Sequence, residues 1–137
     1  MSTPDTLLVV DAANVVGSVP DGWWRDRRGA AERLRDRLVG YAAEGLPDHP
    51  GPLDVVLVVE GAARGVASVP GVRVVSAPGS GDDRIVELAA EAADRPCLVV
   101  TADRELRRRV GECGARCLGP RTVHGPGQTP GPPPGRT

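Results

Sequence analysis

Short runs of consecutive apolar residues recur along the chain and alternate with segments whose apolar residues repeat at helical spacing. The runs predict strands at these positions: Thr6 to Ala12, Leu53 to Val59, Val72 to Ser76, Cys97 to Thr101 and Ala115 to Leu118. Continuous hydrophobicity is typical of strands buried on both faces of a parallel sheet. Strands separated by helices indicate a mostly parallel, doubly wound α/β sheet of about five strands.

The segments between the strands carry apolar residues three or four positions apart, which predicts helices. The expected helices are Trp23 to Glu44, a segment from Ser80 to Ala92, Asp103 to Val110 and a weak, short one at Ala62 to Ala67. Gly45 and Pro47 end the first helix, and Pro96 blocks continuation of the second. The segment between Ala12 and Trp23 is expected to be a loop.

The 137 residues are enough for one domain with a modest core. We expect this domain to span residues 1–118. From Gly119 onward glycine and proline crowd together, so residues 119–137 are expected to form a disordered tail. The start of the chain lacks the basic region of a signal peptide, and no stretch approaches the roughly 20 apolar residues of a membrane span. We therefore expect a cytoplasmic protein that does not contact membranes.

The composition excludes several reaction classes. All 17 basic residues are arginine and the net charge is −1, so the lysine that a phosphate-binding P-loop, a Schiff-base enzyme or a response-regulator receiver needs is absent. A haloacid-dehalogenase-type phosphatase would need a second Asp two residues after Asp11, but Ala12 and Ala13 follow it. Cys113, Cys117 and His124 lack a fourth zinc ligand, so buried thiols are favoured over a zinc site.

Acidic residues follow the ends of several predicted strands. They are Asp11, Glu60, the pair Asp82 and Asp83, and Asp103. Parallel strands present their carboxyl ends on one edge of the sheet, so these side chains are expected to meet in one cleft there. Carboxylates brought together repel one another unless a cation neutralises them. The sequence therefore predicts a site for Mg²⁺ or Mn²⁺.

Each acid also has a purely structural interpretation. Asp11 and Asn14 are common in turns, and Asp103 could be only the N-cap of the helix that follows. Ser80 with the acid three residues later resembles a capping box. Two adjacent acids in a helix point about 100° apart, so one of Asp82 and Asp83 can face the cleft while the other does not. The conjunction of all the acids favours the metal site.

Three pieces of the sequence, in order, are similar to a known family. They are Val-Val-Asp11-Ala-Ala-Asn14, Gly-Asp82-Asp83-Arg-Ile-Val-Glu-Leu-Ala and Val-Val-Thr-Ala-Asp103-Arg-Glu-Leu. Together they resemble NYN domains of the PIN-like nuclease superfamily, most of all the bacterial YacP-like group, and the second piece also resembles regnase-type endoribonucleases. The likeness spans residues 6–118. It implies a PIN-like three-layer α/β/α sandwich and magnesium-dependent cleavage of RNA.

The resemblance also implies a role for each acidic position. It makes Asp11 the first metal ligand, Asn14 its companion in the loop, Asp82 and Asp83 the central acidic pair, Asp103 the ligand after the fourth strand, and Glu60 a supporting acid. A Mg²⁺ or Mn²⁺ ion there would activate water for in-line attack on a phosphodiester. A histidine-based mechanism is disfavoured, because both histidines lie in loop-like segments far in sequence from the acids.

Clustered arginines suggest a path for single-stranded RNA. The favoured phosphate contacts are Arg104, Arg107, Arg108 and Arg109, which lie beside Asp103 with few acids around them. Arg25 and Arg28 belong to a helix rich in acidic partners, so a solvated face is the preferred interpretation for them. Trp23 and Trp24 could stack on unpaired bases or pack the start of that helix against the sheet, and both interpretations stay open.

Two other functions remain alternatives to an endoribonuclease. A nucleotide pyrophosphohydrolase would also use an acidic metal cleft. A catalytically inactive RNA-binding module would keep the fold with a degenerate site. The sequence does not decide between one metal ion and two, and it leaves a homodimer open as an alternative to a monomer.

Overall fold

The computed structural model describes residues 5–19 and 22–123 and shows a five-stranded parallel sheet. Its strands are β1 (Leu7–Asp11), β4 (Asp54–Val59), β5 (Val72–Ser76), β6 (Cys97–Val100) and β7 (Arg116–Leu118). They lie in the order β5-β4-β1-β6-β7, so the first strand of the chain is the central strand of the sheet. The predicted strands are confirmed to within one or two residues.

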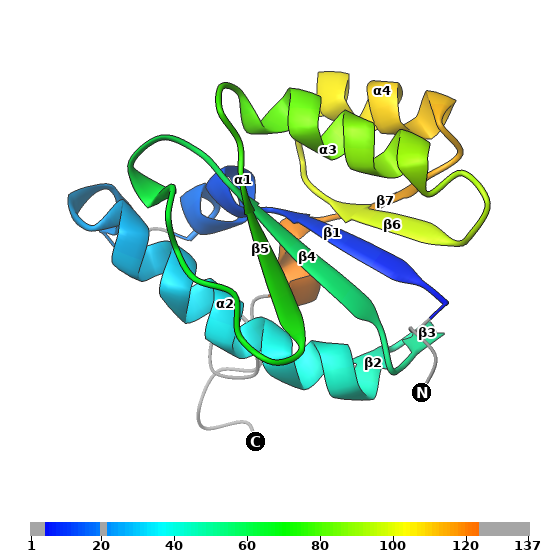
Figure 1. Cartoon of the computed structure of the whole chain (residues 1–137), viewed down its shortest axis with the longest axis horizontal. Coiled ribbons are helices and arrows are strands. Elements are labelled where there is room, and N and C mark those ends of the chain that lie inside the picture. Colours follow the sequence, from blue (N-terminus) through cyan, green and yellow to red (C-terminus); the bar gives the residue numbers. More distant parts are fainter. Residues whose placement is uncertain (1–4, 20–21, 124–137) are drawn as a thin grey trace, which may run out of the picture.

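Helices cover both faces of this sheet (Figure 1). The helices are α1 (Ala12–Gly17), α2 (Arg27–Glu44), α3 (Gly81–Glu91) and α4 (Arg104–Glu112). On one face α1 and α2 pack on a core that includes Leu8, Val10 and Leu34. On the other face α3 and α4 pack on a core that includes Leu7 and Val9. The predicted three-layer, doubly wound α/β/α architecture is therefore confirmed.

The alternation of side chains along β1 decides where Asp11 points. Successive residues of a strand face opposite sides of a sheet. Leu8 and Val10 belong to the core under α1 and α2, whereas Leu7 and Val9 belong to the core under α3 and α4. Asp11 continues the second series, so its carboxylate is directed toward the layer that contains α3 and α4.

One predicted loop and two predicted helices differ from the structure. The segment after Asp11, predicted as a loop, begins with the short helix α1, because Asp11 itself caps it. The helix predicted from Trp23 begins instead at Arg27, since Trp23–Arg25 forms a separate 3₁₀ turn and Asp26 is the N-cap of α2. The weak helix predicted at 62–67 is only a 3₁₀ turn, Gly61–Ala63.

A small antiparallel hairpin follows α2 and was not predicted. It pairs β2 (Gly45–Leu46) with β3 (His49–Pro50). Gly45 ends α2 with a φ of 86°, a backbone conformation that side chains rarely adopt. Each strand of the hairpin has only two residues, which is too short to show the alternation that would identify a strand from sequence.

The start of the predicted disordered tail is ordered. Pro120–Val123 forms a 3₁₀ turn, and Val123 is 0% exposed in the core under α1 and α2. The expectation of disorder from residue 119 is therefore wrong for these residues. Glycine and proline dominate the composition of the tail, so the sequence did not indicate that Val123 packs in the core. Residues 124–137 lie outside the described residues.

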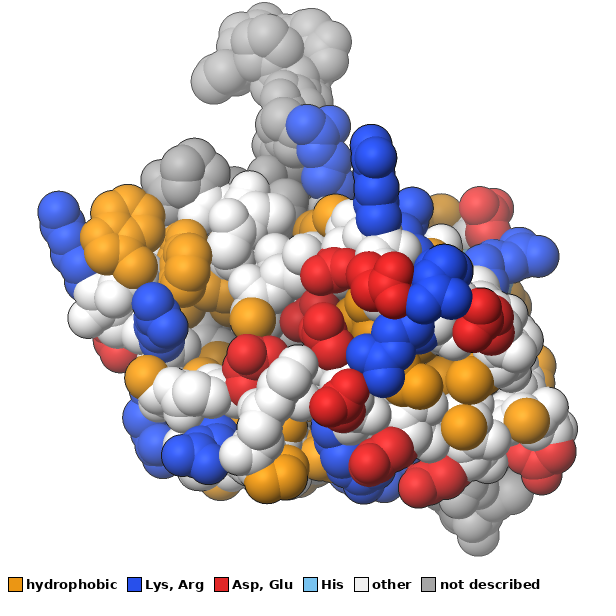
Figure 2. All heavy atoms as spheres, turned by 90° about the horizontal axis from the view of Figure 1, so that it is seen from above, with side chains coloured by type: hydrophobic (Ala, Val, Ile, Leu, Met, Phe, Trp, Pro, Cys, Tyr) orange, Lys and Arg blue, Asp and Glu red, His pale blue; other side chains and the backbone are white. Residues whose placement is uncertain are grey.

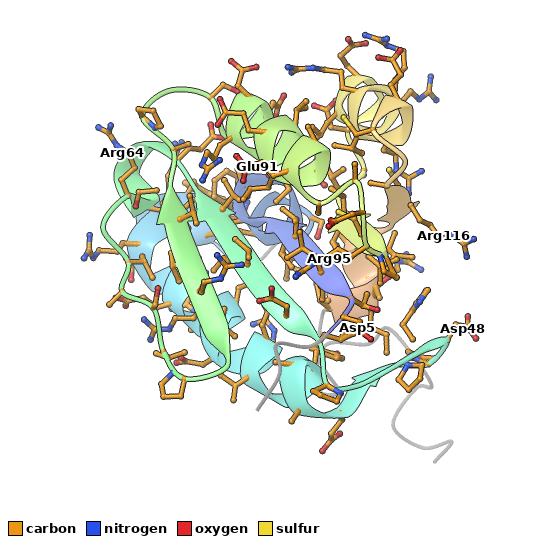
Figure 3. The ribbon with its side chains drawn as sticks, turned by 45° about the vertical axis from the view of Figure 1, so that its right-hand side comes forward. Asp5, Asp48, Arg64, Glu91, Arg95 and Arg116 are labelled. Atoms are coloured by element: carbon orange, nitrogen blue, oxygen red, sulfur yellow. The ribbon has the colours of Figure 1, made fainter. Side chains whose placement is uncertain are left out.

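The amino edge of the sheet carries charges that are already paired. Arg95 donates a hydrogen bond to Asp54 Oδ2 across 2.6 Å, and Arg73 reaches the same oxygen at 3.4 Å. Arg95 and Asp5 lie at this end of the molecule (Figure 3). No helix among the described residues has the length and apolar character needed to span a membrane.

We predict that Val123→Ala lowers the free energy of unfolding by about 1–3 kcal/mol, because it removes buried methyl groups and leaves a cavity. The matched control is Val39→Ala, since Val39 is 39% exposed and should change stability by less than about 0.5 kcal/mol. Urea unfolding of both variants measures the difference. Equal effects would show that Val123 does not belong to the core.

Candidate active site

The strand order brings the ends of β1 and β6 together at the centre of the sheet. The chain crosses from one half of the sheet to the other here, and ligands of such folds bind beyond the carboxyl ends of the strands at this switch point. Asp11 ends β1, and Thr101 follows β6 directly. Within the described part of the chain, Asp11 and Thr101 are the two buried polar residues.

Asp11 is held by hydrogen bonds at both carboxylate oxygens. Oδ1 accepts from the Asn14 backbone N–H at 3.3 Å, which caps α1, and Oδ2 accepts from the Thr101 hydroxyl at 2.9 Å. The residue is only 5% exposed. The structural interpretation of Asp11 as a turn or cap residue is therefore correct, but a surface cap would not need this degree of burial.

Burial raises the pKa of Asp11 from its ordinary value of 3.8 to about 6. Desolvation is the largest cause, and the hydrogen bonds from Thr101 and Asn14 oppose it. The negative charges of Asp82 and Glu60 raise the pKa further. Asp11 therefore lies in a site where negative charge accumulates.

Thr101 and Asn14 connect the loop after β6 to the end of β1 and to α1. The Thr101 hydroxyl oxygen accepts from the Asp103 N–H at 3.1 Å while it donates to Asp11. Asn14 Oδ1 accepts from the Ala102 N–H at 2.8 Å. Asn14 lies in α1 rather than in the predicted loop. Its side-chain oxygen positions the segment that leads to Asp103. Thr101 was not singled out from sequence, although it lies in the Val-Val-Thr-Ala-Asp piece.

Glu60 fixes the start of α3. Its Oε1 accepts from the Gly81 N–H at 2.9 Å, where a carboxylate is favoured by the helix dipole. A Cβ atom added at Gly81 would lie only 2.5 Å from this oxygen, so a side chain there would displace Glu60. The Gly-Asp-Asp order thus allows Glu60 to approach the backbone immediately before Asp82.

The two adjacent acids of α3 have different surroundings. Desolvation, then the charges of Asp103 and Glu60, raise the pKa of Asp82. The side chain of Asp83 is 72% exposed and accepts a hydrogen bond from Arg109 at 3.0 Å. The structure therefore brings Asp82, and not Asp83, into electrostatic contact with Asp11. The divergence of the two positions was predicted, but sequence alone did not say which one faces the cleft.

Asp103 caps α4 by accepting from the Leu106 N–H at 3.0 Å, as the structural interpretation predicted. Its charge also raises the pKa of Asp82, so it belongs to the same acidic cluster. We use "acidic cluster" for four residues: Asp11, Glu60, Asp82 and Asp103. Seen from above α3 and α4, acidic side chains gather near the middle of this face (Figure 2).

The acidic cluster has suitable donors for a divalent metal, because carboxylate oxygens are the ligands that Mg²⁺ and Mn²⁺ prefer. Among the described residues, no three His, Cys, Asp or Glu side chains stand in an arrangement that could hold an ion as they are. The fit therefore rests on the donor chemistry and on the mutual repulsion seen at Asp11 and Asp82. The three cysteines are free thiols, and His124 lies outside the described residues.

The arginines of α4 are more fully paired than the sequence indicated. Arg108 binds Glu105 and Glu112, Arg109 binds Asp83, and Arg107 donates from Nε to the Thr101 carbonyl at 3.0 Å. The expectation of few counter-charges is therefore wrong for Arg108 and Arg109. Arg104, beside Asp103, is exposed and has no ion pair within the described part of the chain.

Some of the aromatic and basic residues around the start of α2 are bound within the protein, and others are exposed. Arg28 donates to the carbonyls of Arg64 and Gly65 at 2.9 and 3.0 Å, which supports the structural interpretation of this arginine. Arg25 lies over the Trp24 ring, with the guanidinium carbon 5.8 Å from the ring centroid. Trp24 is 54% exposed, whereas Trp23 lines a pocket.

Comparison with known proteins supports the fold. No family model matches the sequence, and no curated protein matches it either. Among solved structures, the chain is similar to Rae1 (YacP) from Bacillus subtilis, a NYN/PIN-like protein, with a TM-score of 0.68 and 19% identity. The match covers 85% of this chain and 70% of the other. The predicted resemblance to YacP-like proteins is thus confirmed at the level of structure, and the chain has a PIN-like fold.

Proposed function

We propose that this protein is a ribonuclease that hydrolyses RNA phosphodiesters with the help of Mg²⁺ or Mn²⁺. The observation that carries the proposal is the burial of Asp11 at the end of the central strand, where the charges of Asp82 and Glu60 act on it. A buried carboxylate without an ion-pair partner is costly even when it is hydrogen-bonded, and proteins retain such groups where function needs them. This carboxylate lies at the carboxyl end of the central parallel strand, and ligands of doubly wound folds commonly bind at that edge.

Asp11, Asp82 and Asp103 are the proposed metal ligands. Glu60 is assigned a supporting role, because one of its oxygens already binds the Gly81 N–H. Asp83 is assigned to the pairing of α3 with α4 through Arg109. A bound divalent ion would supply an activated water and neutralise charge on the scissile phosphate.

The remaining side chains act by positioning. Thr101 orients the Asp11 carboxylate and the Asp103 backbone with one hydroxyl group. Asn14 fixes the intervening loop through the Ala102 N–H. Arg104, at the first position of α4 and next to Asp103 in the chain, is a cation available for a phosphate. The expected products carry 5′-phosphate and 3′-hydroxyl ends.

RNA is favoured as substrate over a free nucleoside triphosphate by the way the helical Glu residues are used. Pyrophosphohydrolases are expected to carry clusters of Glu on helices, and the Glu residues of α3 and α4 pair with Arg84 and Arg108 instead. The proposal includes a cytoplasmic location. An inactive RNA-binding module is the outcome to be expected if no metal response is measured.

We predict that Mn²⁺-dependent cleavage of single-stranded RNA is lost in Asp11→Asn and in Asp82→Asn, because each removes a ligand charge. Asp83→Asn is the matched control from the adjacent position and should retain cleavage within about threefold of the wild type, since Asp83 faces Arg109. A gel assay with a labelled oligonucleotide measures the rates. Undiminished cleavage by Asp11→Asn would overturn the assigned site.

Mn²⁺ should also raise the melting temperature of the wild type but not of Asp11→Asn, because a ligand that binds the folded state stabilises it. Differential scanning fluorimetry with and without EDTA measures this shift. The measurement does not depend on finding the right RNA. A wild type that does not respond to Mn²⁺ or Mg²⁺ would exclude the metal-dependent mechanism.

The raised pKa of Asp11 predicts a pH-dependent stability in the metal-free protein. The folded state binds a proton below about pH 6, whereas the unfolded state binds one only near the ordinary value of 3.8. The ionisation penalty is therefore fully present above about pH 6 and disappears as the pH falls toward 3.8. Between about pH 7.5 and about pH 4.5, the wild type should gain roughly 2 kcal/mol relative to Asp11→Asn. Urea unfolding of both proteins in EDTA measures this; a constant difference would contradict it.

Arg104→Ala should weaken RNA binding and reduce the salt dependence of binding by about one phosphate contact. Arg108→Ala is the control, because Arg108 is held by Glu105 and Glu112 and should leave binding unchanged. Both variants can be compared by fluorescence anisotropy at several salt concentrations in the Asp11→Asn background, where RNA is not cut. Equal loss in the two variants would remove the special role of Arg104.

A further inference from the structure

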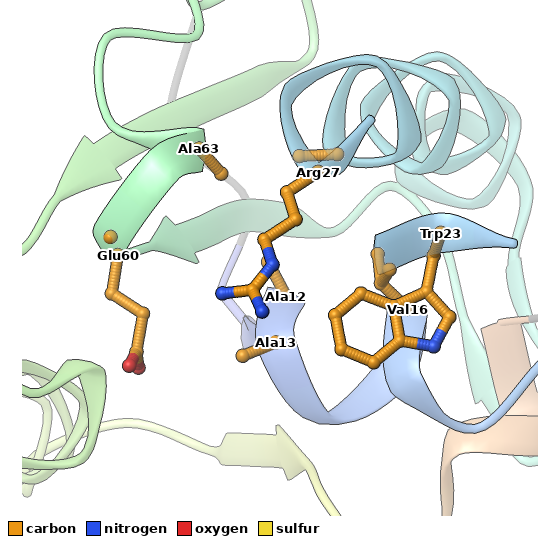
Figure 4. A pocket seen from close by; sticks show the side chains of 9 residues that line it. Ala12, Ala13, Val16, Trp23, Arg27, Glu60 and Ala63 are labelled. Carbon is orange, nitrogen blue, oxygen red and sulfur yellow. The ribbon is translucent and has the colours of Figure 1, made fainter. Parts of the chain in front are cut away.

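A pocket of about 140 Å³ opens next to the acidic cluster. Its floor is formed by Ala12 and Ala13, the residues that follow Asp11 directly, and its two sides by Trp23 and Glu60. Arg27 extends from α2 into the space between these sides, as the close-up shows (Figure 4). The pocket therefore has an aromatic wall at one side and a carboxylate of the acidic cluster at the other.

The Trp23 ring is held in place from two directions. It packs over Gly17, where an added Cβ would lie 3.6 Å from Trp23 Cζ2. It also meets the Trp24 ring edge to face, with centroids 6.1 Å apart and planes at 87°. The rotamer entropy of Trp23 is therefore largely lost before any ligand arrives, which favours binding by a preorganised ring.

Arg27 is the cation of this pocket. Its guanidinium carbon lies 5.3 Å from the Trp23 ring centroid. Among the described residues, no carboxylate lies within ion-pair distance of Arg27. Neighbouring arginines differ, because Arg28 is bound to carbonyls and Arg35 to Asp36. Arg27 can therefore exchange its contact with the ring for a phosphate oxygen without breaking a salt bridge.

Packing of α2 against the sheet explains why an aromatic residue stands here, but it does not explain the open pocket beside the ring. Three small residues leave the space next to the Trp23 ring unfilled: Ala12, Ala13 and Ala63. An occupant must match a flat ring, a cation and a position beside carboxylates that are proposed to hold a metal ion. An unpaired nucleobase with its phosphate has all three properties, and base–aromatic stacking tolerates any base.

We propose that this pocket binds one unpaired base of the RNA substrate next to the scissile phosphate, with the base against Trp23 and Arg27 on the adjoining phosphate. The inference rests on the proposed nuclease function and deepens it. Ala12 and Ala13 line the pocket and directly follow Asp11 in the sequence, and Glu60 also lines it. A base bound in the pocket would therefore lie next to the acidic cluster. The pocket thus sets the register of the strand and requires an unpaired nucleotide at the cut.

Fluorescence provides a direct test, because Trp23 and Trp24 are the only tryptophans of the 137-residue sequence. In Asp11→Asn with Trp24→Phe, Trp23 is the sole tryptophan and RNA is not cut. Short single-stranded RNA should quench this fluorescence, and a series in which one nucleotide at a time is abasic should lose the quenching at one position. Equal quenching by every abasic oligonucleotide would overturn the proposal.

Binding affinities complete the test. Trp23→Ala should weaken binding of the same RNA by roughly 5-fold to 100-fold, as expected for loss of one stacked base, whereas Trp24→Ala should weaken it by a smaller factor, because Trp24 only supports the Trp23 ring. Ala13→Leu fills the pocket from an exposed position and leaves Trp23 in place, so it keeps the test valid if Trp23→Ala unfolds. Tight binding by Ala13→Leu and by a folded Trp23→Ala would exclude the pocket.

The failure of this inference can be distinguished from failure of the proposed nuclease. If the wild type cuts RNA and Trp23→Ala and Ala13→Leu cut it equally well at the same position, the nuclease stands and the base pocket is wrong. If no variant and no wild type cuts RNA, yet Trp23 is quenched only by oligonucleotides with the base present, the pocket is correct and the nuclease function is wrong.

Discussion

The structure depends on a buried carboxylate at the end of its central strand. Asp11 follows four apolar residues that lie in the middle of the sheet, and its burial raises its pKa to about 6. A charge in this position destabilises the folded protein, so the fold must hold it by hydrogen bonds from Thr101 and Asn14. The bond from Thr101 in turn joins the end of β1 to the loop after β6, and these are the two strands that flank the switch point of the sheet.

The other acids of the cluster lie at the N-termini of α3 and α4, which hold them near Asp11. Glu60 accepts from the first N–H of α3, and Asp103 caps α4. Helix dipoles favour carboxylates at these places, so each acid is stabilised locally while the cluster as a whole is repulsive. This division explains how a residue that caps a helix can also be a proposed metal ligand. A cap is a way to fix a carboxylate without immobilising both of its oxygens.

Most of the fold could be predicted from the sequence, because continuous apolar runs identify buried strands wherever they occur. The start of α1 was missed because its cap is also the end of β1, and Val123 was missed because one apolar residue among glycine and proline carries no periodicity. At the site, the position of acidic residues after strand ends predicted which residues would form the acidic cluster. Only the geometry of α3 separates Asp82 from Asp83, since adjacent helical positions differ by direction and not by composition.

The same constraint explains why an open pocket borders the acidic cluster. α1 begins directly after Asp11, so its first residues lie close to the carboxylate, and two of these residues, Ala12 and Ala13, are small. Their size leaves room beside Trp23, whose ring is fixed over Gly17. A metal site and a base site that share one short helix would move together, so a strand positioned by the pocket would present its phosphate to Asp11 in a fixed geometry. Selectivity for unpaired RNA would then follow from the position of α1, without contacts that read the sequence.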